Sequence, residues 1–407
     1  MNRANRIVQV VAALVVSVAL QESANAAEQV SKSTVQTASQ KLEWSAKTGI
    51  GYDANIYRTH KGNYIDHYPA TALAVSPVTQ SGFFVPYKAE VDFKMNTATN
   101  FGLVAGGKVD GESYLSHNNA NTFNYEGRFG VNNVFAGKGA RADELYAGVL
   151  IGHHKKIYVD RDSGVAKQTA GGSNISNRYT YDSTGFEAEY RKNSDDTFRF
   201  SANATLENRA YADPIVVAKY DHQFIQLGGD IEFVPAKANL LKLAYTYESS
   251  DFSARRSRDK NGSYLAANPL LVYTDHNYKF YWRTHLGEPL VAYADVALTK
   301  HSDAFVNYSG YTEIEYGARL LYKATKQLQG RFALSKWGRN YSSAYAYDNP
   351  TQPRLTADGV VLSLKGEYEL MPHVSLWAEM ENRTWNTNDL RYDYKRYQFL
   401  VGAVMEY

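Results

Sequence analysis

The stretch that decides the fold is the end of the sequence, Tyr397-Gln398-Phe399-Leu400-Val401-Gly402-Ala403-Val404-Met405-Glu406-Tyr407. Every odd-numbered residue in it is apolar or aromatic, whereas the polar residues Gln398 and Glu406 occupy even positions. Side chains alternate between the two faces of a β-strand. The stretch therefore predicts an amphipathic strand that ends on an aromatic residue.

The same alternation recurs upstream, from residue 42 onward. In 198–207 apolar residues at even positions interleave with Arg, Ser, Asn, Thr and Glu at odd positions, and 87–95, 241–248 and 360–369 repeat the pattern. Many of these segments exceed the ~5–6 residues usual for globular strands and match the ~9–11 residues of a transmembrane strand. Short connections alternate with long ones such as 159–177 and 254–270, a pattern typical of outer-membrane barrels.

This pattern predicts an all-β fold, a transmembrane antiparallel β-barrel of about 16 strands, with 14–18 strands left open. Around 16 strands the lumen is wide enough for an aqueous channel. The expected strands are 42–57, 69–95, 101–115, 121–135, 142–158, 178–191, 197–211, 217–233, 239–253, 271–285, 289–305, 311–323, 327–342, 356–369, 373–387 and 392–407. Segment 69–95 is interrupted by prolines and also fits a hairpin.

The start of the sequence predicts export. Arg3 and Arg6 precede an apolar run over 7–20, and Ala24-Asn25-Ala26 supplies a small-x-small cleavage site. We expect a signal peptide over 1–26, a periplasmic leader over 27–41 and the barrel over 42–407. Cysteine is absent, so disulfides and thiolate catalysis are excluded, and 44 basic against 42 acidic residues gives no basic excess for nucleic-acid binding.

The terminal strand resembles the C-terminal recognition signal of outer-membrane barrel proteins, with Phe399 and Tyr407 as its aromatic residues. The resemblance implies insertion by the barrel assembly machinery. We expect an integral protein of the bacterial outer membrane, cleaved near Ala26, with outer-membrane lipid and lipopolysaccharide as its surroundings.

Apolar residues on the lipid side place the charged ones on the lumen side, since a Lys or Arg at the lipid-facing midplane costs ~2–4 kcal/mol. Tyr146, Tyr281 and Tyr293 share that side and could stack on sugar rings. The same residues also fit a wall whose charges pair across neighbouring strands. The predicted lumen-lining residues are Asp53, Asn55, Glu126, Arg128, Glu187, Glu189, Arg191, Arg199, Asp230, Glu232, Glu313, Glu315, Arg319, Lys365 and Glu367.

A basic cluster marks the expected outer loop 254–270. It consists of Arg255, Arg256, Arg258 and Lys260. Such a cluster near the outer leaflet would bind lipopolysaccharide phosphates or an acidic polymer. A solvated basic loop is the alternative.

Catalytic, cofactor and metal sites are not predicted. His301-Ser302-Asp303 are consecutive, and neighbours on a strand point to opposite faces, so the triplet cannot form a relay by itself. His153-His154 lacks a spaced carboxylate partner for a metal. The sequence contains no Gly-x-Ser-x-Gly elbow and no phosphate-binding loop. We therefore expect that the chain is not an enzyme.

Residues 51–58, Gly-Tyr-Asp-Ala-Asn-Ile-Tyr-Arg, carry a Gly-Tyr-Asp-x-Asn opening. It is similar to the start of the β-barrel porin 2 family and, less closely, to the barrel of surface lipoprotein assembly modifiers. The first resemblance implies a conduit for exopolysaccharide or capsule export that works with a periplasmic export protein. A general or substrate-selective porin for small hydrophilic solutes, and an adhesin or receptor scaffold with a closed lumen, are the alternatives.

Overall fold

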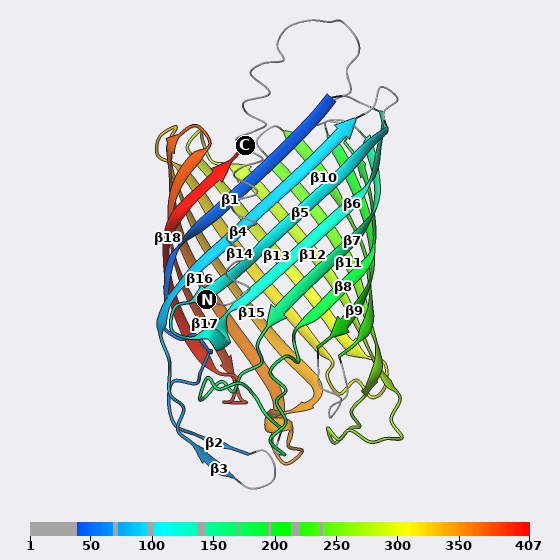
Figure 1. Cartoon of the computed structure of the whole chain (residues 1–407), viewed down its shortest axis with the longest axis vertical. Coiled ribbons are helices and arrows are strands. Elements are labelled where there is room, and N and C mark those ends of the chain that lie inside the picture. The colour runs from blue at the N-terminus through cyan, green and yellow to red at the C-terminus, as the bar shows by residue number, and fades with distance from the viewer. Residues whose placement is uncertain are drawn as a thin grey trace, which may run out of the picture.

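The computed structural model describes residues 39–67, 72–96, 101–136, 143–169, 171–193, 197–212, 220–236 and 239–407. These residues form one closed antiparallel barrel of 16 strands, which confirms the predicted fold class (Figure 1). Its strands are β1 (Ser39–Asp53), β4 (Gly82–Asn96), β5 (Phe101–Tyr114), β6 (Thr122–Ala136), β7 (Asp143–Lys156), β8 (Tyr181–Lys192), β9 (Phe198–Tyr211), β10 (His222–Ala236), β11 (Asn239–Arg256), β12 (Leu270–His285), β13 (Leu290–Asp303), β14 (Tyr311–Lys323), β15 (Leu328–Tyr345), β16 (Arg354–Met371), β17 (Val374–Thr387) and β18 (Tyr394–Glu406).

Each barrel strand pairs with its neighbour along the chain, and β1 pairs with β18 to close the ring. The strands span from 12 residues in β8 to 18 residues in β11. A strand rises ~3.4 Å per residue, so even tilted strands of this length cross a hydrocarbon core of ~30 Å. No helix in the described part of the chain is long and apolar enough to cross a membrane.

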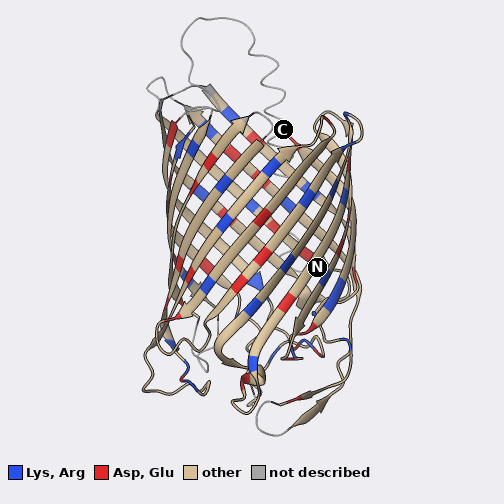
Figure 2. Cartoon of the chain, turned by 180° about the vertical axis from the view of Figure 1, so that it is seen from behind, with Lys and Arg blue, Asp and Glu red and all other residues tan. Residues whose placement is uncertain are grey.

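The outer wall of the barrel is apolar. Every second residue along a strand points outward, and these outward positions carry large hydrophobic side chains, as the sequence alternation predicts. Examples are Ile50, Phe129, Phe186, Leu243, Tyr316 and Phe399, all of which are exposed on the barrel's outside. In water such a surface would be costly, and in a bilayer it faces lipid. The charged residues of both signs are distributed along the same strands (Figure 2).

The expected strand 69–95 is wrong over its first half. The barrel strand β4 begins only at Gly82, and the preceding chain holds a small separate hairpin of β2 (Tyr64–Asp66) and β3 (Leu73–Val75). Pro77, between β3 and β4, cannot donate to a strand ladder, whereas Pro86 is accommodated within β4. Pro69 lies outside the described residues.

The N-terminal boundaries differ slightly from expectation. The barrel begins at Ser39 rather than at residue 42, so the last residues assigned to the leader belong to β1. The rest of the expected signal peptide and leader, 1–38, lies outside the described residues.

The two ends of the barrel have different connections. Short turns over 286–289, 324–327 and 372–373 share one end with Tyr407, whereas the segments 54–67, 72–81, 157–169, 171–180 and 257–269 lie at the other end (Figure 1). Short turns are periplasmic and long loops extracellular in outer-membrane barrels. The long loops therefore define the outer mouth.

Candidate functional site

The lumen wall carries charges that are paired along and across strands. Arg128 and Asp92 form one such pair, with 2.6 Å between nitrogen and oxygen and nearly half of each side chain exposed. Pairs this exposed contribute only ~0–1 kcal/mol each. The other pairs made by predicted lumen residues are Arg191 with Glu189, Arg199 with Glu232, Lys242 with Asp230 and Glu232, Arg319 with Asp295, Arg339 with Glu313, and Lys365 with Glu367.

Three other predicted lumen residues, Glu187, Glu126 and Glu315, also have neighbours on adjacent strands. Glu187 accepts a hydrogen bond of 2.8 Å from the hydroxyl of Tyr146. Glu126 lies opposite Lys108 in the register, and Glu315 lies opposite Trp337. Most of the predicted lumen charges therefore have a partner of opposite charge close by.

Asp53 differs from the other lumen charges because it is fully buried. Its carboxylate accepts hydrogen bonds from Arg396 (Nε to Oδ2, 2.8 Å), from the Tyr114 hydroxyl (2.9 Å) and from Gln398 (3.2 Å). The backbone N–H of Asn55 donates to the other oxygen at 2.9 Å. These hydrogen bonds and the opposite charges of Asp53 and Arg396 offset the cost of removing both groups from water.

Gly51 makes room for the chain that follows. A Cβ atom at Gly51 would lie 2.5 Å from the ring of Phe84, which is completely buried over it. Phe84 stacks on Tyr114 and, with Ile56 and Tyr57, forms a compact apolar cluster inside the outer mouth. The Gly-Tyr-Asp-x-Asn motif thus turns the chain inward at the end of β1.

The turn after β1 is joined to the loop between β7 and β8. The hydroxyl of Thr59, which is fully buried, donates to the carbonyl of Arg161 at 2.6 Å. The hydroxyl of Tyr64 donates to the carboxylate of Asp162 at 2.8 Å. Burial is the main reason that the pKa of Asp162 is raised. Two loops from different parts of the ring are therefore joined by hydrogen bonds.

Contacts also cross the mouth. The guanidinium of Arg161 lies 4.9 Å from the ring centre of Tyr392, in the loop between β17 and β18. Between these two loops the ring contains β18, β1, β4, β5, β6 and β7, so the β7–β8 loop reaches over part of the opening. The outer mouth is narrowed by loops, whereas the strands below it form the wide barrel.

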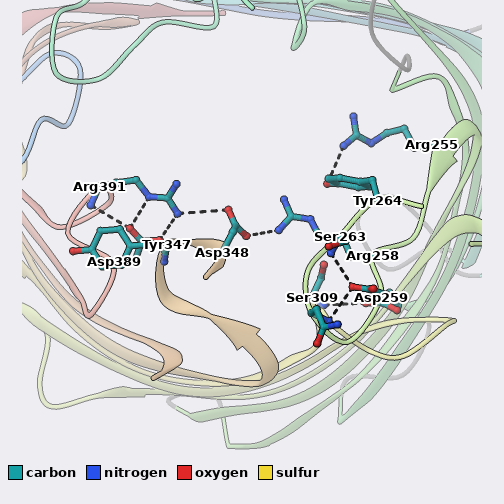
Figure 3. A network of polar contacts seen from close by, with 12 residues as sticks. Arg255, Arg258, Asp259, Ser263, Tyr264, Ser309, Tyr347, Asp348, Asp389 and Arg391 are labelled. Carbon is teal, nitrogen blue, oxygen red and sulfur yellow. Dashed lines mark hydrogen bonds and ion pairs between the residues drawn. The ribbon is translucent and has the colours of Figure 1, made fainter. Parts of the chain in front are cut away.

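A chain of ion pairs continues this arrangement. Asp348, between β15 and β16, bonds to Arg258 and lies 3.5 Å from Arg391. Arg391 also binds both carboxylate oxygens of the buried Asp389, at 2.9 and 2.7 Å. Arg258 and Arg391 approach Asp348 from opposite sides (Figure 3). Burial opposes the charge of Arg391 but its acidic partners prevail, so its pKa is raised.

These loops enclose a cavity of about 380 Å³. Its lining includes four arginines, two aspartates and a group of aromatic residues that come from six different connections and the adjoining strand ends. The arginines are Arg58, Arg161, Arg258 and Arg391, the aspartates are Asp348 and Asp389, and the aromatic residues are Tyr264, Tyr273, Tyr308, Tyr341, Tyr345, Trp385, Tyr392 and Tyr394. Small-molecule sites are concave and have volumes of ~300–1,000 Å³, so the cavity is large enough for a ligand.

The predicted basic cluster is divided by the fold. Arg258 points into the cavity, whereas the guanidinium of Arg255 lies 3.7 Å from the ring centre of Tyr220. Arg256 donates to the carbonyl of Asn268 at 3.0 Å, and Lys260 is exposed. The four residues therefore do not form one surface patch.

Several cavity residues were not predicted. Arg58 is the last residue of the motif over 51–58, but the motif does not indicate a role for it. Arg161 lies in a loop far from Arg58 in sequence. One feature of the sequence does indicate the cavity, because Trp385, Tyr392 and Tyr394 flank Arg391 within a short segment. His301 also has a partner that the sequence did not reveal, since its Nδ1 lies 2.8 Å from the carboxylate of Asp275 on the adjacent strand.

No family model and no curated protein sequence matches the chain. Solved structures do. The anion-selective porin from Comamonas acidovorans aligns with a TM-score of 0.51 and 9% identity over 91% of this chain and 100% of that one. The channel DcaP of Acinetobacter baumannii aligns with a TM-score of 0.48 and 11% identity over 93% and 99% of the two chains.

The chain has the closed β-barrel fold of an outer-membrane porin. Its apolar outer wall and closed ring place it in the outer membrane as an integral protein, in contact with lipid and lipopolysaccharide. The resemblance to the β-barrel porin 2 family is supported only at this coarser level, since no family model matches.

OmpT, an outer membrane protein of Vibrio cholerae, also aligns, with a TM-score of 0.46 and 10% identity over 90% and 99% of the chains. One expectation is corrected, namely that the chain is not an enzyme. A fold shared at this level excludes no activity. The exclusion of an enzyme is therefore withdrawn.

Proposed function

We propose that this porin-like barrel is a passive conduit for a hydrophilic carbohydrate, with the export of exopolysaccharide or capsule as its role. The observation that carries the proposal is the polar, charge-balanced lumen wall inside a closed 16-strand ring. A balanced wall offers hydrogen-bond partners along its length without holding a polymer tightly. Insertion by the barrel assembly machinery and a periplasmic export protein as partner belong to the same proposal.

Tyrosines on the lumen wall support a carbohydrate rather than an ion as the cargo. The rings of Tyr281 and Tyr293 lie 6.0 Å apart on neighbouring strands. The guanidinium of Arg319 lies 5.7 and 5.3 Å from their ring centres. Aromatic faces beside hydrogen-bond donors suit the apolar face and the hydroxyl rim of a sugar ring.

A substrate-selective porin for small solutes is the second candidate. The observation that favours it is the narrowing of the outer mouth, where the β7–β8 loop contacts the turn after β1 and Tyr392 beyond it. A narrow mouth limits the size of a solute, whereas a polymer would require the loops to separate. A scaffold with a closed lumen is the third outcome.

Single-channel conductance of the purified full-length barrel in a planar bilayer tests the proposal. Steady openings that are blocked by the cell's own polysaccharide support the export conduit. Openings blocked only by small solutes support the selective porin. A variant that lacks residues 61–79 is measured beside the full-length barrel. It loses the hydrogen bond between Tyr64 and Asp162, which joins two of the loops that narrow the outer mouth. If neither form conducts, the conduit is refuted and the scaffold remains.

A further inference from the structure

The cavity at the outer mouth contains more positive than negative charge. Its four arginines face two aspartates, and both aspartates are already bound by Arg258 and Arg391. In the described part of the chain, Arg58 and Arg161 have no carboxylate within ion-pair distance. Two guanidinium groups thus line a half-enclosed space without a counter-charge.

Both of these arginines are held by aromatic rings instead of acids. The guanidinium of Arg58 lies 5.9 Å from the ring centre of Tyr394, and that of Arg161 lies 4.9 Å from that of Tyr392. Burial lowers the pKa of Arg58, as expected for a cation that lacks an anionic neighbour. Nη1 of Arg161 is buried and has no hydrogen-bond partner among the residues that the structure describes. A buried donor without a partner is costly, and a bound anion would satisfy it.

The rest of the lining is suited to a ring. Trp385 and Tyr345 line the same cavity as the two arginines, together with Tyr392 and Tyr394. Stacking surfaces and a few convergent polar groups are the usual make-up of a small-molecule site. An inorganic anion alone would make no use of these faces. A ligand with a carboxylate on a sugar ring would use both parts of the lining.

We propose that the outer-mouth cavity binds a uronic acid residue, with Arg58 and Arg161 pairing to its carboxylate and the Trp385 face packing against its ring. Arginine forks bind carboxylates in a bidentate manner. This inference rests on the proposed conduit, because it names an acidic polysaccharide as the cargo. The Asp348 and Asp389 carboxylates keep Arg258 and Arg391 in place beside the ligand.

Isothermal titration of the full barrel in detergent micelles with tri-galacturonate tests the inference. The matched probes are a neutral galactose trimer and inorganic phosphate. We expect binding of the uronate trimer and at least ~10-fold weaker binding of both other probes, since a hydrogen bond to a charged group contributes ~1.5–3 kcal/mol. Equal binding of the neutral trimer, or of phosphate, overturns the uronate assignment.

Variants locate the site. Arg58→Gln/Arg161→Gln should weaken uronate binding ~10-fold or more, whereas Lys326→Gln, in the exposed short turn 324–327 at the opposite end of the barrel, should leave it unchanged. Slower migration of the heated barrel on an SDS gel verifies that each variant is folded. Unchanged binding by the double variant overturns the proposal.

Conductance of the same samples separates this inference from the proposed function. A barrel that conducts but does not bind uronate retains the conduit and loses the site. A barrel that binds uronate through Arg58 and Arg161 but never conducts retains the site and loses the conduit.

Discussion

Neutralising Asp53 should destabilise the barrel far more than neutralising an exposed lumen charge. In Asp53→Asn, the guanidinium of Arg396, of which only 8% is exposed, loses its ionic partner. Breaking a buried pair by removing one member costs ~3–5 kcal/mol, because the other charge stays buried without compensation. The amide can still accept from Tyr114, so we expect a loss near ~3 kcal/mol in the free energy of unfolding.

The matched control is Asp92→Asn, which removes the partner of Arg128 from a pair that is 41% and 47% exposed. Its expected cost is below ~1 kcal/mol. Urea unfolding of both variants in phospholipid vesicles, followed by tryptophan fluorescence, provides the comparison. The double variant Asp53→Asn/Arg396→Gln should recover part of the loss. Equal costs for Asp53→Asn and Asp92→Asn would refute the reasoning, since burial would then have no effect.

Two further predictions concern the seam between β1 and β18. Gly402→Ala should prevent a heat-stable barrel from forming, because the new Cβ would collide with the Thr48 carbonyl oxygen. Gly366→Ala should be neutral, because a Cβ there would have no atom within 4 Å. Gel mobility after heating compares the two variants, and equal mobility would contradict the close approach at Gly402. Tyr407→Ala should lower the amount of barrel in outer-membrane fractions several-fold. The free energy of unfolding should change by less than ~0.5 kcal/mol, because the exposed Tyr407 side chain fills no cavity. An unchanged amount of barrel would contradict a role of Tyr407 in assembly.

The barrel wall could be predicted because a bilayer imposes one simple demand on every strand. A strand between lipid and lumen must alternate, so 198–207 and 360–369 were recognisable without any knowledge of their partners. The observed strands β9 and β16 contain these segments. The prediction of one strand over 69–95 was wrong because the first half of this segment lies outside the barrel wall, where side chains need not alternate.

The outer mouth could not be predicted, because its contacts join residues far apart in the chain. Arg396 is 343 positions from Asp53, and local alternation contains no information about that pair. Arg58 and Arg161 lie in loops whose paths depend on many weak contacts. The sequence identified Asp53 and Asn55 as polar residues near the mouth, but their burial results from contacts with distant residues such as Arg396 and Lys395.

The pairing of Trp44 with Tyr407 has a consequence for biogenesis. The two residues exchange backbone hydrogen bonds of 3.0 and 2.9 Å, and they join strands from opposite ends of the described chain. One edge of β1 therefore stays unpaired until β18 is added to the sheet. An unpaired edge invites pairing with other chains. Closure of the ring removes both free edges at once, so it is the step that protects the barrel from edge-to-edge association.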